Sequence, residues 1–351
     1  MAPKLQTGGE VGYLRIATEE AFAPPELFAE WRRLLDAGLD DPGFRSFFGF
    51  ILTSDTPRAE FVRERLPDLG ERRLADMDAT GIDRQILSIS APGPNPLEPD
   101  RAAAITTLAN DRLAAACREH PDRFSALATI APQDAKHAAA ELDRCKKLGF
   151  VGTIVNSHIQ HEYLDDPKFW PIFEACEALD LPLYLHPNTP SKGLIAPMLD
   201  VRLEGAIFGF AVETGLHLLR LIVSGVFDRF PRLRIVVGHL GEGLPFWLYR
   251  LDYMFKSGGR RATENRAQRV PSDYLRQNVW VTTSGMPWSP SIMLCREVLG
   301  ADRVLYAMDY PWQYEADEVR AHDALPLSPA EKKVLMQTNA EHLFNLSTAK
   351  S

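Results

Sequence analysis

The feature that most constrains the fold is the alternation of eight short hydrophobic runs with segments of helical length. The runs are almost continuously apolar, which is typical of parallel strands buried on both faces. Eight strand–helix units predict an α/β fold, a (β/α)8 TIM barrel, rather than an open sheet. The absence of GxGxxG after the first run also weakens a dinucleotide-binding fold. The expected strands are 13–18, 84–90, 124–131, 150–157, 181–186, 233–239, 278–283 and 303–308.

The segment between the first two expected strands, 23–83, is unusually long. It contains two helical patterns and a middle rich in glycine and phenylalanine, 43–50, but too few apolar residues for a core of its own. We therefore predict an insertion over the top of the barrel within a single domain that spans 1–351. At the other end, Ser328 is a suitable N-cap before Pro329, and 328–346 is expected to form a closing helix.

Composition and charge exclude several functions. The 351 residues carry a net charge of −8, which argues against a nucleic-acid partner. No apolar stretch is long enough for a membrane span, and the N-terminal ten residues lack the apolar centre of a signal peptide, so a cytoplasmic protein is expected. The cysteines are widely spaced and are interpreted as reduced thiols of the core: Cys117, Cys145, Cys176 and Cys295.

Residues that can bind a metal stand at the ends of several expected strands. Catalytic groups of barrels come from the C-terminal ends of different strands. Here those ends carry Glu19 on the first strand, His186 on the fifth, His239 on the sixth and Asp309 on the eighth. Two histidines and two carboxylates that converge on one rim predict a metal-dependent active site.

Several motifs give the chain a more specific resemblance over nearly its whole length. By them the chain resembles the aromatic-acid decarboxylases of the amidohydrolase superfamily, the branch of aminocarboxymuconate-semialdehyde decarboxylase. The motifs are I-A-T-E-E-A-F at 16–22, R-R-L-A-D-M-D-A-T-G-I-D at 72–83, L-Y-L-H-P at 183–187, G-A-I-F-G-F at 205–210, G-H-L-G-E-G-L-P at 238–245, W-L-Y-R-L-D at 247–252 and Y-A-M-D-Y-P at 306–311.

The resemblance implies one divalent metal held by Glu19, His186 and Asp309. His239 would lie beside it, either as an acid/base partner of Asp309 or as a fourth ligand. The usual third residue of the first-strand motif is replaced by Ala21, and the fourth strand offers no bridging lysine, so a mononuclear site is expected. Two carboxylates and an imidazole favour Mn²⁺, with Zn²⁺ second. No organic cofactor is expected.

The implied activity is non-oxidative decarboxylation of an ortho-hydroxybenzoate, with 5-carboxyvanillate converted to vanillate and CO2. Asp309 would protonate the ring carbon beside His239. The small aromatic carboxylic acid would be bound by side chains near the rim, in an enzyme that is a homodimer or homotetramer with the long insertion as the expected contact. The expected substrate-binding residues are Arg58, Arg250, Ser90, Phe210 and Tyr310, with Trp312 as a further aromatic candidate.

Two alternatives stay open. A metal-dependent hydrolase of a lactone or amide would have the same fold, although the missing H-x-H motif and lysine weaken it. A non-catalytic binding barrel is disfavoured because all four strand-end residues are present. Five other residues receive structural interpretations: Glu20 should face away from Glu19, Arg72 and Arg73 should form ion pairs that hold the insertion, and His158 and His161 should belong to a surface loop.

Overall fold

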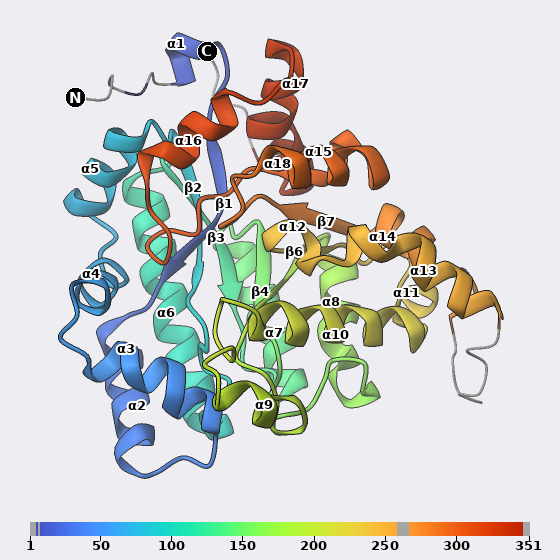
Figure 1. Ribbon diagram of the computed structural model, residues 1–351. Helices are drawn as coiled ribbons and strands as arrows, with labels where there is room; N and C mark the ends of the chain where they lie inside the picture. Colours follow the sequence, from blue (N-terminus) through green and yellow to red (C-terminus); the bar gives the residue numbers. More distant parts are fainter. Residues whose placement is uncertain (1–4, 6–7, 258–266, 347–351) are drawn as a thin grey trace.

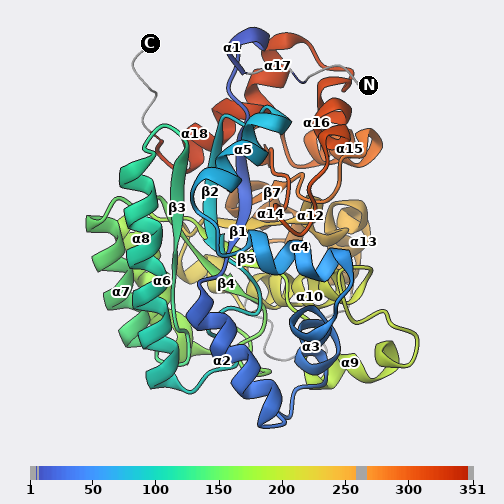
Figure 2. The same ribbon diagram turned by 90° about the vertical axis from the view of Figure 1, so that its left-hand side faces the viewer.

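The computed structural model describes residue 5, residues 8–257 and residues 267–346. Within these residues, eight parallel strands form one sheet in the order β1 to β8, and helices surround it (Figures 1 and 2). The Thr18 and Ala21 N–H groups donate to the carbonyls of Tyr306 and Tyr310, which joins β1 to the segment around β8. This arrangement confirms the predicted (β/α)8 barrel. The strands are β1 (Ile16–Phe22), β2 (Arg84–Ile89), β3 (Phe124–Thr129), β4 (Gly152–Asn156), β5 (Leu183–His186), β6 (Ile235–Val237), β7 (Val279–Thr282) and β8 (Val304–Leu305).

Local signals in the sequence account for several helix boundaries. The Asp134 carboxylate accepts the N–H groups of Lys136 and His137 and caps α7, while Ser328 and Glu331 form a capping box at the start of the closing helices. The helices between β2 and the C-terminus are α6 (Pro99–Glu119), α7 (Ala135–Lys147), η2 (Pro167–Phe169), α8 (Trp170–Leu179), α9 (Lys192–Leu199), α10 (Gly209–Val223), α11 (Val226–Arg229), α12 (His239–Glu242), α13 (Leu244–Ser257), α14 (Pro271–Asn278), α15 (Ser289–Val298), η4 (Ala301–Arg303), α16 (Ala316–Asp323), α17 (Pro329–Lys333), η5 (Val334–Thr338) and α18 (Asn339–Leu343).

The first strand differs from its predicted range. It was expected at 13–18 with Glu19 just beyond its end, whereas β1 runs from Ile16 to Phe22 and places Glu19 inside the strand. The pairing with β2 shifts register between Ala17 and Glu20, as at a β-bulge. The prediction was wrong because buried glutamates at 19 and 20 look like the polar end of a strand.

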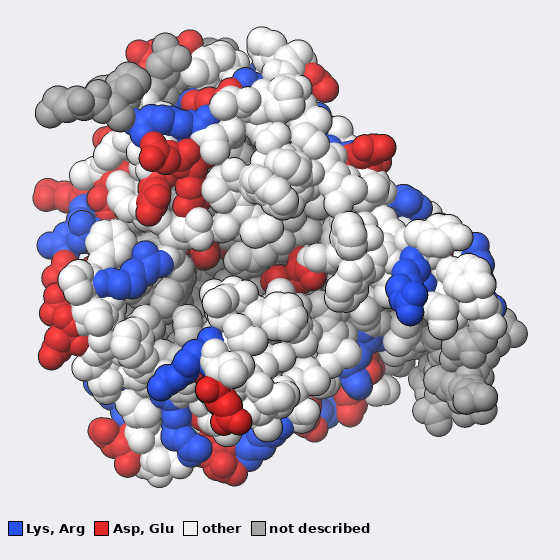
Figure 3. Space-filling model, viewed as in Figure 1, with Lys and Arg blue, Asp and Glu red and all other residues white. Residues whose placement is uncertain are grey.

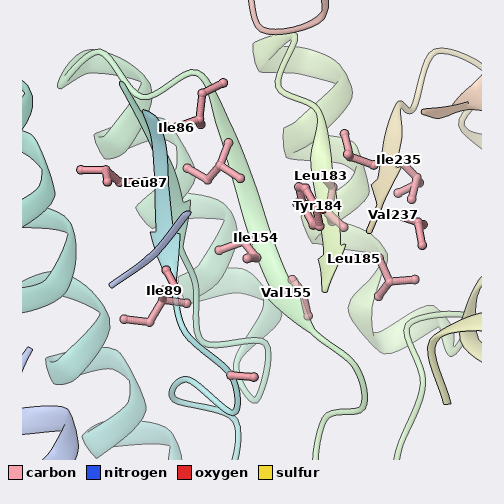
Figure 4. Packing of buried hydrophobic residues seen from close by; sticks show 14 of the residues in the cluster. Ile86, Leu87, Ile89, Ile154, Val155, Leu183, Tyr184, Leu185, Ile235 and Val237 are labelled. Atoms are coloured by element: carbon pink, nitrogen blue, oxygen red, sulfur yellow. The ribbon is translucent and has the colours of Figure 1, made fainter. Parts of the chain in front are cut away.

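Apolar side chains of the strands belong to one buried core. Side chains of β2, β4, β5 and β6 pack against one another (Figure 4). Leu183, Leu185 and Ile235 have no exposed surface, and burial of each such side chain contributes about 1.5–3 kcal/mol. The sheet is therefore covered by packed apolar side chains, and the chemistry is expected at the strand ends.

The insertion 23–83 packs as part of the barrel. Its elements are α2 (Pro25–Asp36), the π-helical turn η1 (Phe44–Phe48), α3 (Gly49–Thr53), α4 (Pro57–Arg65) and α5 (Glu71–Thr80), more than the two helical patterns expected. The short α1 (Gly8–Val11) precedes β1. Trp31 and Phe48 belong to the same buried cluster as the strands, and Trp31 donates to the carbonyl of Gly93. The insertion thus shares its core with the barrel, and the assignment of 1–351 to one domain stays a prediction.

Two further observations bear on the predictions. All four cysteines are free thiols on helices α6, α7, α8 and α15; Cys145, Cys176 and Cys295 are buried in the core as expected, whereas Cys117 is only partly buried. Among the described residues, no helix combines the length and the apolar character that a membrane crossing needs.

Candidate active site

Three of the predicted residues meet at the C-terminal end of the barrel. Glu19, His186 and Asp309 each offer one ligand atom, and these atoms lie within 4.8 Å of one another. They come from β1, the end of β5 and the loop after β8. His186 and Asp309 also line a cavity of about 330 Å³, and the molecular surface in Figure 3 is hollowed near the middle of the face shown.

Glu19 is buried and strongly anchored. Its Oε2 accepts hydrogen bonds from the Tyr184 hydroxyl and from Thr282 Oγ1, the latter at 2.9 Å. Its Oε1 lies 3.4 Å from His186 Nε2 and makes no hydrogen bond with the described protein atoms. Burial raises the pKa of Glu19, but His239, His186 and the Tyr184 hydroxyl outweigh burial and lower that pKa to about 2. The side chain is therefore an ionised carboxylate with one oxygen left for a cation.

Tyr184 and Thr282 were not predicted, although the sequence carried a signal for Tyr184. It precedes His186 by two residues on β5, so both side chains face the same side of the sheet. Gly238 makes room for the carboxylate that they hold, because a Cβ at that position would lie 2.9 Å from Glu19 Oε2. Any larger residue at Gly238 would displace Glu19.

His186 is oriented by the backbone. Its Nδ1 lies 2.9 Å from the carbonyl oxygen of Pro187. A carbonyl oxygen can only accept a hydrogen bond, so Nδ1 carries the hydrogen. The Nε2 atom then keeps its lone pair and points toward Glu19 Oε1. A histidine that ligates a metal commonly donates its other N–H to such an acceptor.

Asp309 and His239 form a second pair at the rim. Asp309 Oδ2 lies 3.9 Å from His239 Nε2, and His239 Nδ1 lies 3.3 Å from Glu242 Oε1. Burial raises the pKa of Asp309, and His239 lowers it, but the effect of burial is the larger one. Burial lowers the pKa of His239, but Glu19, Glu242 and Asp309 together raise it well above its usual value. The pair can therefore share or pass a proton.

The cavity wall is rich in aromatic side chains, several of which come from the insertion. Phe47 packs edge-on against Phe210, with ring centroids 5.1 Å apart, and lies 6.0 Å from the Trp312 ring. Arg58, in the first turn of α4, supplies a cation at the same cavity. Phe210 and Arg58 thus lie where they were expected. Phe47 was not predicted, because its position depends on how η1 packs against the barrel.

Three other predicted substrate contacts lie elsewhere. Tyr310 is buried beneath the rim and donates its hydroxyl to Asp76 Oδ2 at 2.8 Å. Ser90 is also buried, and its Oγ accepts the Trp312 indole N–H at 2.9 Å, so it supports the aromatic wall rather than facing the cavity. Arg250 is exposed on α13 and is not among the residues that line the cavity. Gln313, which was not predicted, lines the cavity beside Asp309.

A second group of metal-type side chains, Asp41, His158 and His161, has ligand atoms within 4.8 Å of one another. His158 was expected on a surface loop, but only 2% of its surface is exposed. Its Nδ1 accepts the His161 N–H at 2.9 Å, and His161 Nδ1 accepts the Lys192 N–H at 3.4 Å. A neutral imidazole has one accepting nitrogen, so both lone pairs are already engaged and this group does not fit a metal.

The Glu19, His186 and Asp309 group does fit one divalent cation. Two carboxylates and one imidazole give an oxygen-rich donor set that suits Mn²⁺ and accepts Zn²⁺. The buried Glu19 Oε1 without a hydrogen-bond donor is the atom that a cation would satisfy. His239 lies next to this group.

Comparisons with known proteins show what the whole chain is similar to. A family model described as Amidohydrolase matches residues 31–346. A crystal structure of 5-carboxyvanillate decarboxylase from Novosphingobium aromaticivorans, complexed with manganese and 4-hydroxy-3-methoxy-5-nitrobenzoic acid, is 53% identical to this chain. It superimposes with a TM-score of 0.96 and covers 99% of this chain and 100% of that chain.

Two further relatives are named as decarboxylases of dihydroxybenzoates. Gamma-resorcylate decarboxylase from Polaromonas sp. is 35% identical over 95% of this chain and 99% of its own length. A structure of dihydroxybenzoic acid decarboxylase from Polaromonas sp., with bound manganese and the inhibitor 2-nitroresorcinol, has a TM-score of 0.82 and 34% identity. It covers 96% of this chain and 98% of that chain.

Proposed function

Because the chain belongs to the amidohydrolase family and is a carboxy-lyase of hydroxybenzoates, we propose that it converts 5-carboxyvanillate to vanillate and CO2. The observation that carries the choice of substrate is Arg58 at the same cavity as His186 and Asp309. 5-Carboxyvanillate has two carboxylates, of which only one is lost. The guanidinium of Arg58 can bind the carboxylate that is retained, which a dihydroxybenzoate does not possess.

The metal in this proposal is bound by Glu19, His186 and Asp309, with Mn²⁺ favoured over Zn²⁺. When bound, it would act as a Lewis acid and neutralise the charge of the substrate oxygens. Tyr184 and Thr282 hold the Glu19 carboxylate, and the Pro187 carbonyl holds His186 in the tautomer that ligates. The relatives whose structures contain manganese support the choice of metal.

The proton in the reaction comes from this chain. We assign Asp309 as its donor, because its carboxyl group lines the cavity and its Oδ2 lies 3.9 Å from His239 Nε2, which can resupply the proton. Asp309 transfers the proton to the ring carbon that bears the carboxylate. The bond between that carbon and the carboxylate then breaks, its electron pair restores the aromatic ring, and CO2 leaves. His239, 3.9 Å from Asp309 Oδ2, returns a proton to Asp309 for the next turnover.

The aromatic wall positions the ring and excludes water. Phe47, Phe210 and Trp312 present apolar surface to the cavity, and Ser90 fixes the Trp312 indole through a hydrogen bond at 2.9 Å. An apolar wall around the ring favours the neutral product CO2 and keeps bulk water from competing for the proton.

The test is turnover by the metal-loaded enzyme. The protein is purified with added Mn²⁺, and loss of 5-carboxyvanillate and gain of vanillate are followed by ultraviolet absorbance and chromatography, with Asp309→Asn alongside. We expect conversion by the wild type and none by the variant. Turnover of 2,6-dihydroxybenzoate in place of 5-carboxyvanillate would contradict the substrate, and lactone or amide hydrolysis would contradict the reaction class.

We further propose that the enzyme acts as a homodimer or homotetramer. Helix α13 exposes large apolar side chains, with Phe246 77% and Tyr249 83% accessible, which is unusual for a surface that stays in water. This surface lies on α13, whereas the expected contact was the insertion. Arg250 belongs to the same helix, so its predicted contact with substrate requires a neighbouring subunit. Light scattering coupled to gel filtration tests the assembly, and a monomer would contradict it.

A further inference from the structure

Asp309 has an unusual backbone conformation, with a φ of 72°. A residue with a side chain rarely adopts this left-handed region, and such strain persists only where the surroundings determine the conformation strongly. The residues before and after Asp309, Met308 and Tyr310, are both buried at 1% exposure. Their contacts therefore decide where the Asp309 carboxylate points.

Met308 is held by Glu20. The Met308 N–H donates to Glu20 Oε1 at 3.0 Å, and the Glu20 side chain has no exposed surface. Glu20 lies on β1 next to Glu19 but turns away from it, as the alternation of side chains along a strand requires. One strand thus supplies a ligand candidate through Glu19 and a contact to the Asp309 loop through Glu20.

Glu20 is itself fixed by a buried chain of hydrogen bonds. Gln85 Nε2 donates to Glu20 Oε2 at 3.1 Å, and Gln85 Oε1 accepts from Arg73 Nη1, also at 3.1 Å. Arg73 Nη2 donates to the Ala21 carbonyl at 2.6 Å, which returns the chain to β1. Arg73 was predicted to hold the insertion through ion pairs, whereas these contacts are hydrogen bonds to Gln85 and to backbone oxygens.

Tyr310 is held by the same group of residues. The Arg73 guanidinium lies 4.6 Å from the centroid of the Tyr310 ring, and the Tyr310 hydroxyl donates to Asp76 on α5. The Ala21 N–H donates to the Tyr310 carbonyl at 2.6 Å. The backbone on both sides of Asp309 is therefore anchored to β1 and α5, while the Asp309 side chain stays directed at the cavity.

We propose that Glu20 is a positioning residue that acts through Asp309: it holds the Met308 N–H and thereby sets the carboxylate of Asp309 for metal binding and proton transfer. The inference rests on the proposed function, because it takes Asp309 as ligand and proton donor. It adds that Glu20 on β1, Gln85 on β2 and Arg73 on the insertion helix α5 together fix a catalytic group in the loop after β8.

The experiment compares Glu20→Ala and Glu20→Gln with the wild type. The alanine variant removes the acceptor of the Met308 N–H, whereas the glutamine variant keeps an acceptor oxygen for it. Binding of Mn²⁺ to metal-free protein is titrated by electron paramagnetic resonance, and kcat and KM are measured on 5-carboxyvanillate. We expect Glu20→Ala to lower Mn²⁺ affinity and kcat roughly 10- to 100-fold with little change in KM, and Glu20→Gln to recover much of this loss.

Glu141→Ala is the matched control. Glu141 on α7 is also a buried carboxylate, 6% exposed, and accepts a hydrogen bond from Asn110 at 2.7 Å, but it is absent from the cavity lining. The Glu141→Ala substitution should lower the midpoint of thermal unfolding and leave the affinity for Mn²⁺ unchanged. In an Asp309→Asn background, Glu20→Ala should have little further effect on Mn²⁺ affinity, because both changes act on one group.

Four results would overturn the proposal or the function on which it rests. Glu20→Ala that lowers only thermal stability would reduce Glu20 to a structural role. Equal losses in the alanine and glutamine variants would show that the hydrogen bond to Met308 is not what Glu20 contributes. Absence of Mn²⁺ binding by the wild type would refute the proposed function itself, whereas binding that Glu20→Ala leaves intact would refute only the role of Glu20.

Discussion

Replacement of Tyr184 by phenylalanine should weaken Mn²⁺ binding without disturbing the packing of β5. The change removes the hydroxyl that donates to Glu19 Oε2 and leaves Thr282, at 2.9 Å, as the remaining donor to that atom. A hydrogen bond to an ionised group contributes about 1.5–3 kcal/mol. That hydrogen bond also forms without metal, so the loss in binding comes from the orientation of Glu19, and we expect the Kd for Mn²⁺ to rise roughly 10- to 100-fold.

The measurement is a Mn²⁺ titration of metal-free protein, with free Mn²⁺ quantified by electron paramagnetic resonance. Thermal unfolding of the metal-free protein reports any change in stability separately. Tyr274→Phe is the matched control, because its hydroxyl also donates to a carboxylate, Asp228 at 2.6 Å, but on helix α14 outside the cavity lining. Tyr274→Phe should bind Mn²⁺ as the wild type does.

Thr282→Val sharpens the comparison. Thr282 Oγ1 contacts both Glu19 Oε2 and, at 3.1 Å, the Tyr184 hydroxyl. The two substitutions together should therefore differ from the sum of their separate effects. If Tyr184→Phe bound Mn²⁺ with wild-type affinity, the reasoning would be refuted, because Glu19 would then not ligate the metal or would not need its orientation held.

Three further predictions can be checked with the same protein. Arg58→Gln should raise KM for 5-carboxyvanillate roughly tenfold or more, and lower kcat less, because it removes a contact to the carboxylate that does not react; steady-state kinetics would show the reverse split if Arg58 served the chemical step. Removal of metal by a chelator should abolish turnover, and Mn²⁺ should restore more activity than Zn²⁺; full activity in metal-free protein would contradict the site. Burial raises the pKa of Cys117 to about 11 and of Cys176 and Cys295 to about 12, so these thiols stay protonated at pH 8 and should react with a thiol reagent only after denaturation; rapid labelling of the folded protein would argue against their burial.

The barrel and the meeting of Glu19, His186 and Asp309 could be predicted because parallel strands of a barrel end on one rim. Hydrophobic runs gave the number and order of the strands, and the residues at their ends gave the group of side chains. The bounds of β1 were wrong because two buried glutamates interrupt its apolar pattern. Tyr184 could have been found from its spacing to His186, since residues two apart on a strand share a face.

The directions of side chains beyond the strands could not be predicted. Tyr310 follows Asp309 in sequence yet points to Asp76, because Asp309 takes a left-handed φ that no pattern in the sequence reveals. Ser90 ends near the rim, but its hydroxyl is engaged by Trp312 from a distant segment. Phe47 lies in a π-helical turn whose placement depends on tertiary packing.

The division of the cavity between two parts of the chain has a consequence for how substrate range can change. The groups proposed for chemistry stand on strand ends, whereas Phe47, Phe48 and Arg58 come from the insertion. Mutations in 43–58 can therefore alter which ring substituents are accepted while the reacting groups keep their places. Exchange of this segment between related decarboxylases would be a direct route to new selectivity, and natural divergence could have followed the same route.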